Sequence, residues 1–251
     1  METKINKILR SWPSGTVALS SWLEEMEVSR QLQQSYQSTD WIASIGHGAF
    51  RRPGDAVDWL GGLYAIQKQA HLNIHVGGRT ALGLLGQAHY LELNPQAIQL
   101  FSPRNVNLPT WFKNYDWGAK LQLRHTDFLP PHVGLVDVES KLFTVRASSA
   151  ARAIMECLYL APDTFDLMEA YQIMEGLDAL RPIIVQQLLE QCRSIKVKRL
   201  FLFMAEQAGH AWVRHLDRSQ IEIGHGKRSL VPGGVYVPKY QITVPRELVK
   251  L

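Results

Sequence analysis

Apolar residues recur three or four positions apart in three short segments near the start of the sequence, and each segment ends at polar or turn-forming residues. This spacing predicts short helices over residues 4–12, 21–26 and 30–38. Ser21, with a glutamate three positions later, is expected to cap the second helix through a capping box. Ser29 is expected to cap the third helix.

Two short strand-like runs follow at residues 41–45 and 49–52, and Gly46-His47-Gly48 separates them. Glycines that tolerate positive φ between two such runs predict a β-hairpin. Three short helices followed by a hairpin are the layout of a winged helix-turn-helix, in which the third helix enters the major groove and the hairpin forms the wing.

Beyond residue 55 helical and strand-like patterns alternate, and after residue 149 helices dominate. We therefore expect an α+β protein with an N-terminal winged helix-turn-helix followed by a mixed α/β C-terminal domain rich in helices. The expected domains are 1–94, with the winged-helix core at 1–53, and 95–251. One helix is predicted between residue 55 and about residue 69, and further helices at 81–85, 151–160, 165–176, 182–192 and 194–207. Strands are predicted at 74–76, 90–93, 98–101, 120–124 and 143–146, with a strand-like tail at 221–244.

The composition is that of an ordinary globular protein, with 46% hydrophobic and 20% charged residues. The longest apolar run, Leu200–Ala205, has six residues, far fewer than a bilayer requires, so we expect no membrane contact and a cytoplasmic location. Cys157 and Cys192 lack CxxC partners, so neither a disulfide framework nor a zinc site is expected. We expect no metal and no cofactor.

The net charge of +4 is mild, but its distribution is uneven. The segment Arg193–Arg228 contains eight basic and three acidic residues, a local excess of five positive charges. Cations are poorly placed in the first turn of a helix, which favours a functional contact, although a solvated turn above a buried face would have the same sequence. The candidate basic patch comprises Lys196, Lys198, Arg199, Lys227 and Arg228.

The third predicted helix is rich in glutamine and contains no acidic residue. Its side chains opposite the apolar pair Leu32 and Tyr36 are expected to face outward. Arginine forms bidentate hydrogen bonds with guanine and glutamine does so with adenine. A solvated helix would also fit, but the position between a capped helix and a hairpin favours contact with DNA. The predicted contact residues are Ser29 at the cap and Arg30, Gln33, Gln34 and Gln37 on the outer face.

The predicted wing carries basic residues on its second strand. Arg51 and Arg52 are expected to meet phosphate or a minor groove. His47 at the tip is a further candidate, although an exposed turn explains it equally well.

Motifs of common enzymes are missing from the sequence. His71 and His75 have the spacing of an HExxH motif, but no glutamate follows His71. The glycine pair at 77–78 is not followed by a Walker lysine, and no Gly-x-Ser-x-Gly or Asp-x-Asp motif occurs. We expect a protein that is not an enzyme. The alternative is an enzyme acting on RNA or nucleotides within the C-terminal domain.

Several segments, in order along most of the chain, resemble the AbiEi antitoxins of type IV (AbiE) toxin–antitoxin systems. They include Trp41-Ile42, Arg52-Pro53-Gly54-Asp55, Pro109-Thr110-Trp111-Phe112, the run Ser148–Ile154, Met174-Glu175-Gly176-Leu177 and the run Lys196–Phe201.

The resemblance implies a bacterial autorepressor whose N-terminal domain binds double-stranded DNA at inverted repeats in its own promoter. It implies a C-terminal domain required to neutralise an AbiEii-like nucleotidyltransferase toxin, without a stable complex between the two proteins. It maps DNA contact to the third helix and the wing, and it implies no catalytic residue. A stand-alone winged-helix regulator without a toxin is the alternative that this resemblance leaves open.

Overall fold

The computed structural model describes residues 4–87, 97–140 and 142–249. The chain divides into two compact units, each built from separate stretches of sequence. The first contains Met1–His75, Asn94–His125 and Asp137–Arg146, and the second contains Val76–Leu93, Thr126–Val136 and Ala147–Leu251. The predicted strand at 90–93 and the predicted domain boundary at 94/95 lie outside the described residues.

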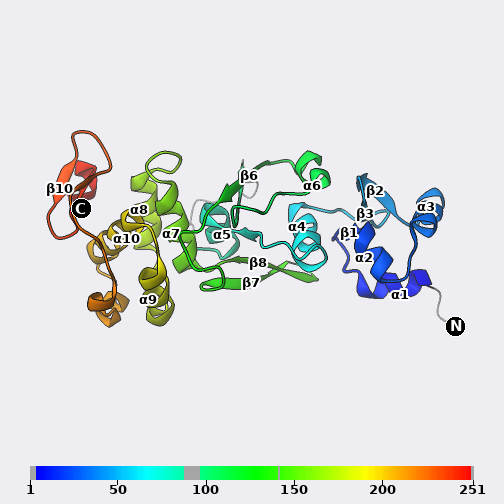
Figure 1. Cartoon of the computed structure of the whole chain (residues 1–251), viewed down its shortest axis with the longest axis horizontal. Coiled ribbons are helices and arrows are strands. Elements are labelled where there is room, and N and C mark those ends of the chain that lie inside the picture. The colour runs from blue at the N-terminus through cyan, green and yellow to red at the C-terminus, as the bar shows by residue number, and fades with distance from the viewer. Residues whose placement is uncertain (1–3, 88–96, 141, 250–251) are drawn as a thin grey trace. The chain divides into compact units, whose positions relative to one another are not determined.

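The first unit begins with three helices and a three-stranded antiparallel sheet (Figure 1). The sheet has the order β1-β3-β2, and Phe50 of β3 lies opposite Ala18 of β1 and Ser44 of β2. The mixed α/β architecture and the predicted hairpin are confirmed, and the short strand β1 was not predicted. The elements are α1 (Lys4–Ser11), β1 (Ala18–Leu19), α2 (Ser20–Glu25), α3 (Arg30–Ser38), β2 (Ala43–Gly46) and β3 (Ala49–Arg51).

Apolar side chains from these elements form one core. Ile8, Trp12, Leu23 and Ile42 are almost completely buried, and burial of this apolar surface is the main force that holds the three helices on the sheet. Leu32 and Tyr36 of α3 pack against the core from its edge. The inward orientation predicted for this pair is therefore confirmed.

One of the two predicted helix caps forms. The Ser29 side chain accepts a hydrogen bond from the amide of Leu32 and caps α3 as predicted. The capping box expected at Ser21 is wrong, because α2 begins one residue earlier, at Ser20, and has no side-chain cap. The glutamate expected in that box, Glu24, pairs with Arg30 instead.

The remainder of the first unit contains α4 (Trp59–Lys68), β5 (Ala97–Ser102), α6 (Thr110–Asn114) and β6 (Lys120–His125). Asp58 caps α4 by accepting from the amide of Gly61. Strands β5 and β6 are parallel, with Ala97 opposite Lys120. The five-stranded sheet has the order β6-β5-β4-β8-β7, where β4 is His75–Val76, β7 is Leu135–Ser140 and β8 is Phe143–Ser148.

The second unit is mainly helical, and its four long helices follow the predicted ranges to within about two residues at each end. They are preceded by the short helix α5. Helices α7 and α10 are apolar around most of their circumference and are correspondingly buried. The helices are α5 (Gly78–Leu84), α7 (Ala150–Leu160), α8 (Leu167–Glu175), α9 (Pro182–Gln191) and α10 (Ile195–Gln207), followed by the short strands β9 (Arg228–Ser229), β10 (Val235–Val237) and β11 (Ile242–Val244).

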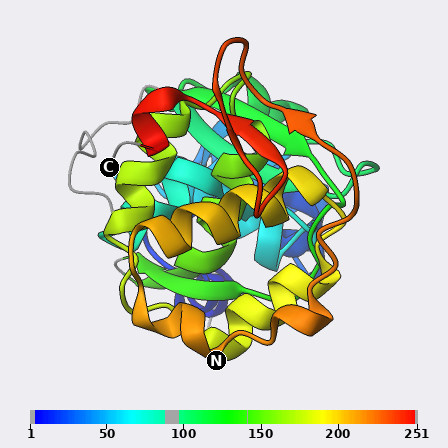
Figure 2. The ribbon, with the colours of Figure 1, turned by 90° about the vertical axis from the view of Figure 1, so that its left-hand side faces the viewer.

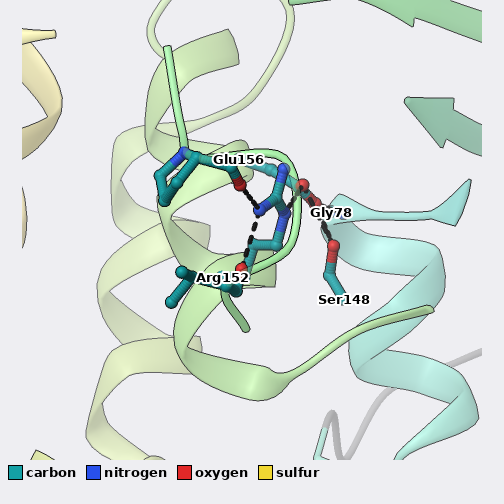
Figure 3. A network of polar contacts seen from close by, with 6 residues as sticks. Gly78, Ser148, Arg152 and Glu156 are labelled. Carbon is teal, nitrogen blue, oxygen red and sulfur yellow. Dashed lines mark hydrogen bonds and ion pairs between the residues drawn. The ribbon is translucent and has the colours of Figure 1, made fainter. Parts of the chain in front are cut away.

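A buried polar network joins α7 to its neighbours in the second unit (Figure 3). The carboxylate of Glu156 accepts hydrogen bonds from the amide of Gly78 at 2.9 Å and from the hydroxyl of Ser148 at 2.8 Å. The Nε of Arg152 donates to the same carboxylate at 3.0 Å, and its Nη1 donates to the carbonyls of Pro130 and Val133. Each charge is therefore paired and hydrogen-bonded, as burial requires.

Within the part of the chain that the structure describes, no helix is both long enough and apolar enough to span a membrane.

We predict that Arg152→Met lowers the free energy of unfolding by about 3–5 kcal/mol, because it leaves the buried Glu156 carboxylate without its counter-charge. The matched control is Arg79→Met, which breaks a half-exposed ion pair with Glu169 and should cost less than about 1 kcal/mol. Urea unfolding followed by circular dichroism measures both. Equal destabilisation by the two variants would contradict the role given to the network.

Candidate nucleic-acid interface

Helix α3 presents a polar face to solvent. Because Leu32 and Tyr36 are held against the core, the opposite side chains point away from it. Arg30, Gln34 and Gln37 are exposed as predicted. Gln31 and Ser38 are exposed on the same face, and their angular positions, about 120° and 140° from the centre of the inward Leu32/Tyr36 face, could have identified them.

Gln33 is not on this face, and the prediction of an exposed Gln33 is wrong. Its side chain is 3% exposed. The Nε2 group donates to the carbonyls of Ser20 and Val28, and Oε1 accepts from the Ser20 hydroxyl at 2.6 Å. Position 33 lies about 80° from the centre of the inward face, on the side where Ser20 and Val28 supply its hydrogen-bond partners. Gln33 therefore ties α3 to the start of α2 and to the turn before α3.

Arg30 is held in place by an ion pair at the N-terminal end of α3. Its Nε lies 2.6 Å from Oε1 of Glu24, and the Arg30 side chain is 82% exposed. Because this bond uses Nε, the two terminal nitrogens of the guanidinium are able to donate together to the O6 and N7 of a guanine. An exposed pair of this kind adds little to stability, so its main effect is on the direction of the Arg30 side chain.

The wing is the β2–β3 hairpin, and His47 is exposed at its tip, as predicted. Gly46 and Gly48 have positive φ. A Cβ on Gly46 would lie 2.8 Å from the Cβ of Trp111, so the hairpin sits directly against α6 within the first unit. Arg51 is half-buried and donates from Nη1 to the carbonyl of Asp55 at 3.0 Å.

Arg52 does not point outward as a phosphate contact would require. Its Nη2 donates to the main-chain carbonyls of Leu9 and Trp12, and its guanidinium lies over the Trp12 ring, 5.5 Å from the centroid. Nearby, the carboxylate of Asp55 accepts from the hydroxyl of Ser14 and from an amide in the turn after α1. These contacts fasten the end of the wing to α1, so we assign Arg52 a structural role.

Two of the five residues of the predicted basic patch are internal. Lys198 and Arg199 are 4% and 1% exposed, which corrects the expectation that both belong to a surface patch. Arg199 donates to the carbonyls of Ile223, Gly226 and Gln241 at 2.7–3.0 Å. Figure 2 shows the C-terminal tail (orange to red) beside α10 (gold). Burial lowers the pKa of Arg199, and the three carbonyls offset this cost by accepting from the charge.

The other three residues of the predicted patch are more accessible. Lys196 is half-buried, donates to the carbonyls of Tyr159 and Ala161, and has a pKa lowered by burial and by the charge of Arg228. Lys227 and Arg228 are exposed, and the Lys227 ammonium lies 5.1 Å from the centroid of the Tyr236 ring. The exposed positive charge is therefore smaller than the sequence indicated.

Across the described ranges 4–87, 97–140 and 142–249, no group of three or more His, Cys, Asp or Glu residues is arranged to hold a metal ion.

We predict opposite behaviour for two adjacent glutamines of α3. Gln33→Ala should lower the free energy of unfolding by about 1–3 kcal/mol, because it leaves buried polar partners without hydrogen bonds. Gln34→Ala, at an exposed position, should change it by less than about 0.5 kcal/mol. Thermal or urea unfolding of both variants measures the difference, and a stability loss confined to Gln34→Ala would refute the orientation of α3.

Comparison with known proteins identifies the family. The model "Transcriptional regulator, AbiEi antitoxin N-terminal domain" matches residues 1–93, and the model "Transcriptional regulator, AbiEi antitoxin, Type IV TA system" matches residues 95–245. No curated protein matches the sequence. Among solved structures, the crystal structure of the RV2827C protein from Mycobacterium tuberculosis is similar, with a TM-score of 0.61 and 13% identity over 98% of this chain and 92% of that chain. At that identity the likeness concerns the fold. The family matches, which together span most of the sequence, show that the chain belongs to the AbiEi family of type IV antitoxins and transcriptional regulators.

Proposed function

We propose that this protein represses its own promoter by binding inverted repeats in double-stranded DNA through α3 and the wing. The observation that carries the proposal is the outer face of α3, where exposed polar side chains surround an arginine already oriented by Glu24. In a winged helix-turn-helix this face enters the major groove. The family description as a transcriptional regulator supports the same activity.

The DNA-contacting set that we propose differs from the one expected from the sequence. Arg30, Gln34 and Gln37 contact bases, with Ser29 at the helix N-terminus beside the backbone. His47 and Arg51 of the wing lie where a wing meets phosphate or a minor groove. Gln33 and Arg52 are left out because their side chains hold the winged helix together.

We further propose that the protein neutralises a nucleotidyltransferase toxin in the cytosol without forming a stable complex with it. The family description as a type IV antitoxin supports a toxin-directed role. We assign this role to the second unit, where Lys196, Lys227 and Arg228 leave a modest basic surface.

Arg30→Ala should weaken binding to the upstream region of the protein's own gene by about 1–3 kcal/mol and should reduce discrimination against shuffled DNA. The matched control is Arg193→Ala, which also removes an exposed arginine paired with a carboxylate, in the second unit. Fluorescence anisotropy at two salt concentrations measures both effects. Unchanged cognate affinity for Arg30→Ala, or equal losses for the two variants, would show that α3 does not read the operator.

The two proposed activities should separate genetically. Arg30→Ala should release repression of a promoter fusion yet still rescue growth when the neighbouring nucleotidyltransferase is expressed, because the substitution leaves the second unit unchanged. Arg193→Ala serves again as the control and should retain repression. Co-purification of tagged protein with the toxin in a stoichiometric complex would contradict neutralisation without a complex.

A further inference from the structure

The exposed face of α3 has an unusual composition for a surface that meets a polyanion. Arg30 is its single charged residue. The other exposed side chains are amides and hydroxyls, from Gln31, Gln34, Ser35, Gln37 and Ser38. Contacts made by this face therefore depend on hydrogen bonding to bases more than on charge.

The amide side chain matches one base edge best. In the major groove adenine presents a donor at N6 beside an acceptor at N7, and a glutamine amide supplies one acceptor and one donor in the same arrangement. Guanine presents two acceptors, which an arginine matches with two donors. A row of glutamines with one arginine is therefore suited to hydrogen-bond a row of adenines with one guanine.

The positions of the side chains form such a row. Arg30, Gln34 and Gln37 lie within about 60° of one another around the helix axis, and they span about 10 Å along it. This length corresponds to roughly three base-pair steps of 3.4 Å. Arg30 is at the N-terminal end of the row, where Glu24 holds it.

Trp41 lies three residues beyond the C-terminal end of α3. Its amide donates to the carbonyl of Tyr36, and the side chain is 48% exposed although it is large and apolar. Apolar side chains in the major groove contact the methyl group of thymine, the partner of adenine. The exposed Trp41 is therefore available for contact with a thymine methyl group.

From these observations we infer that each DNA half-site bound by this protein is rich in A·T pairs, with adenines read by Gln34 and Gln37 and a single guanine read by Arg30. The inference rests on the proposed binding of DNA through α3, and it specifies the class of sequence that this face recognises.

The first test is selection from a library of random 20-base-pair duplexes by the full-length protein. The expected result is enrichment of sites in which a guanine is followed, within about four base pairs, by adenines. Enrichment of G·C-rich sites would overturn the inference while leaving the proposed DNA binding intact. Absence of any enriched sequence would overturn the proposed function itself, so the two failures are distinguishable.

The second test replaces the N7 atom of the adenines by a C–H group, which cannot accept a hydrogen bond. Replacing the adenines of the selected site by 7-deazaadenine deletes the N7 acceptor, and it should weaken binding of the unaltered protein by about tenfold. Gln34→Ala should bind the unmodified site more weakly and should lose less further affinity on the modified one than the unaltered protein does, because only the contact of Gln37 remains to be lost. Gln191→Ala, an exposed glutamine at the end of α9, should behave like the unaltered protein. Equal sensitivity of Gln34→Ala and the unaltered protein to 7-deazaadenine would show that Gln34 does not read an adenine.

Discussion

The burial of Gln33 fixes the rotation of α3 about its own axis, and the DNA-binding face depends on that rotation. Its amide donates to carbonyls at the start of α2 and in the turn before α3, and it accepts from the Ser20 hydroxyl. A buried amide with these partners tolerates little rotation, because leaving any of them unsatisfied costs free energy. Leu32 and Tyr36 add apolar contacts with the same orientation. Arg30, Gln34 and Gln37 face outward as a consequence.

Three arginines hold loops in place through hydrogen bonds to main-chain carbonyls. Arg52, Arg152 and Arg199 each donate to main-chain carbonyls that are distant in sequence. A guanidinium has several donors in a planar group and remains charged when partly buried, so one side chain can fasten several loop carbonyls. In this way the wing is tied to α1, and the C-terminal tail to α10. Formal charge counted along the sequence therefore overstates the charge available to a polyanion.

Local patterns predicted the local structure well. The bounds of α3, its Ser29 cap and the Gly46-His47-Gly48 turn depend on residues within a few positions of one another, and all three are observed. The four long helices of the second unit were predicted for the same reason, since their apolar periodicity is strong. The two-residue strand β1 was not predicted, because pairing with the distant strand β3 defines it more than its own sequence does. Strand β7 was also not predicted, although its neighbour in the sheet, β8, follows it closely in the sequence.

The candidate site was only partly predictable. Exposure of Arg30, Gln34 and Gln37 follows from helical geometry, but the roles of Gln33 and Arg52 depend on partners that the sequence does not place nearby. Lys198 and Arg199 were predicted to be exposed but are buried. The sequence of a basic run at a helix start does not show whether a distant segment, here the C-terminal tail, covers it.

The orientation of α3 is the central claim, and the side-chain amide resonances of its glutamines test it most directly. In nuclear magnetic resonance spectra of protein labelled at glutamine nitrogen, addition of the upstream duplex should shift the side-chain amides of Gln34 and Gln37. The chemical shift of the Gln33 side-chain amide should not change, and its protons should exchange slowly with solvent both before and after DNA is added. A shift of the Gln33 amide, with Gln34 unaffected, would contradict the account.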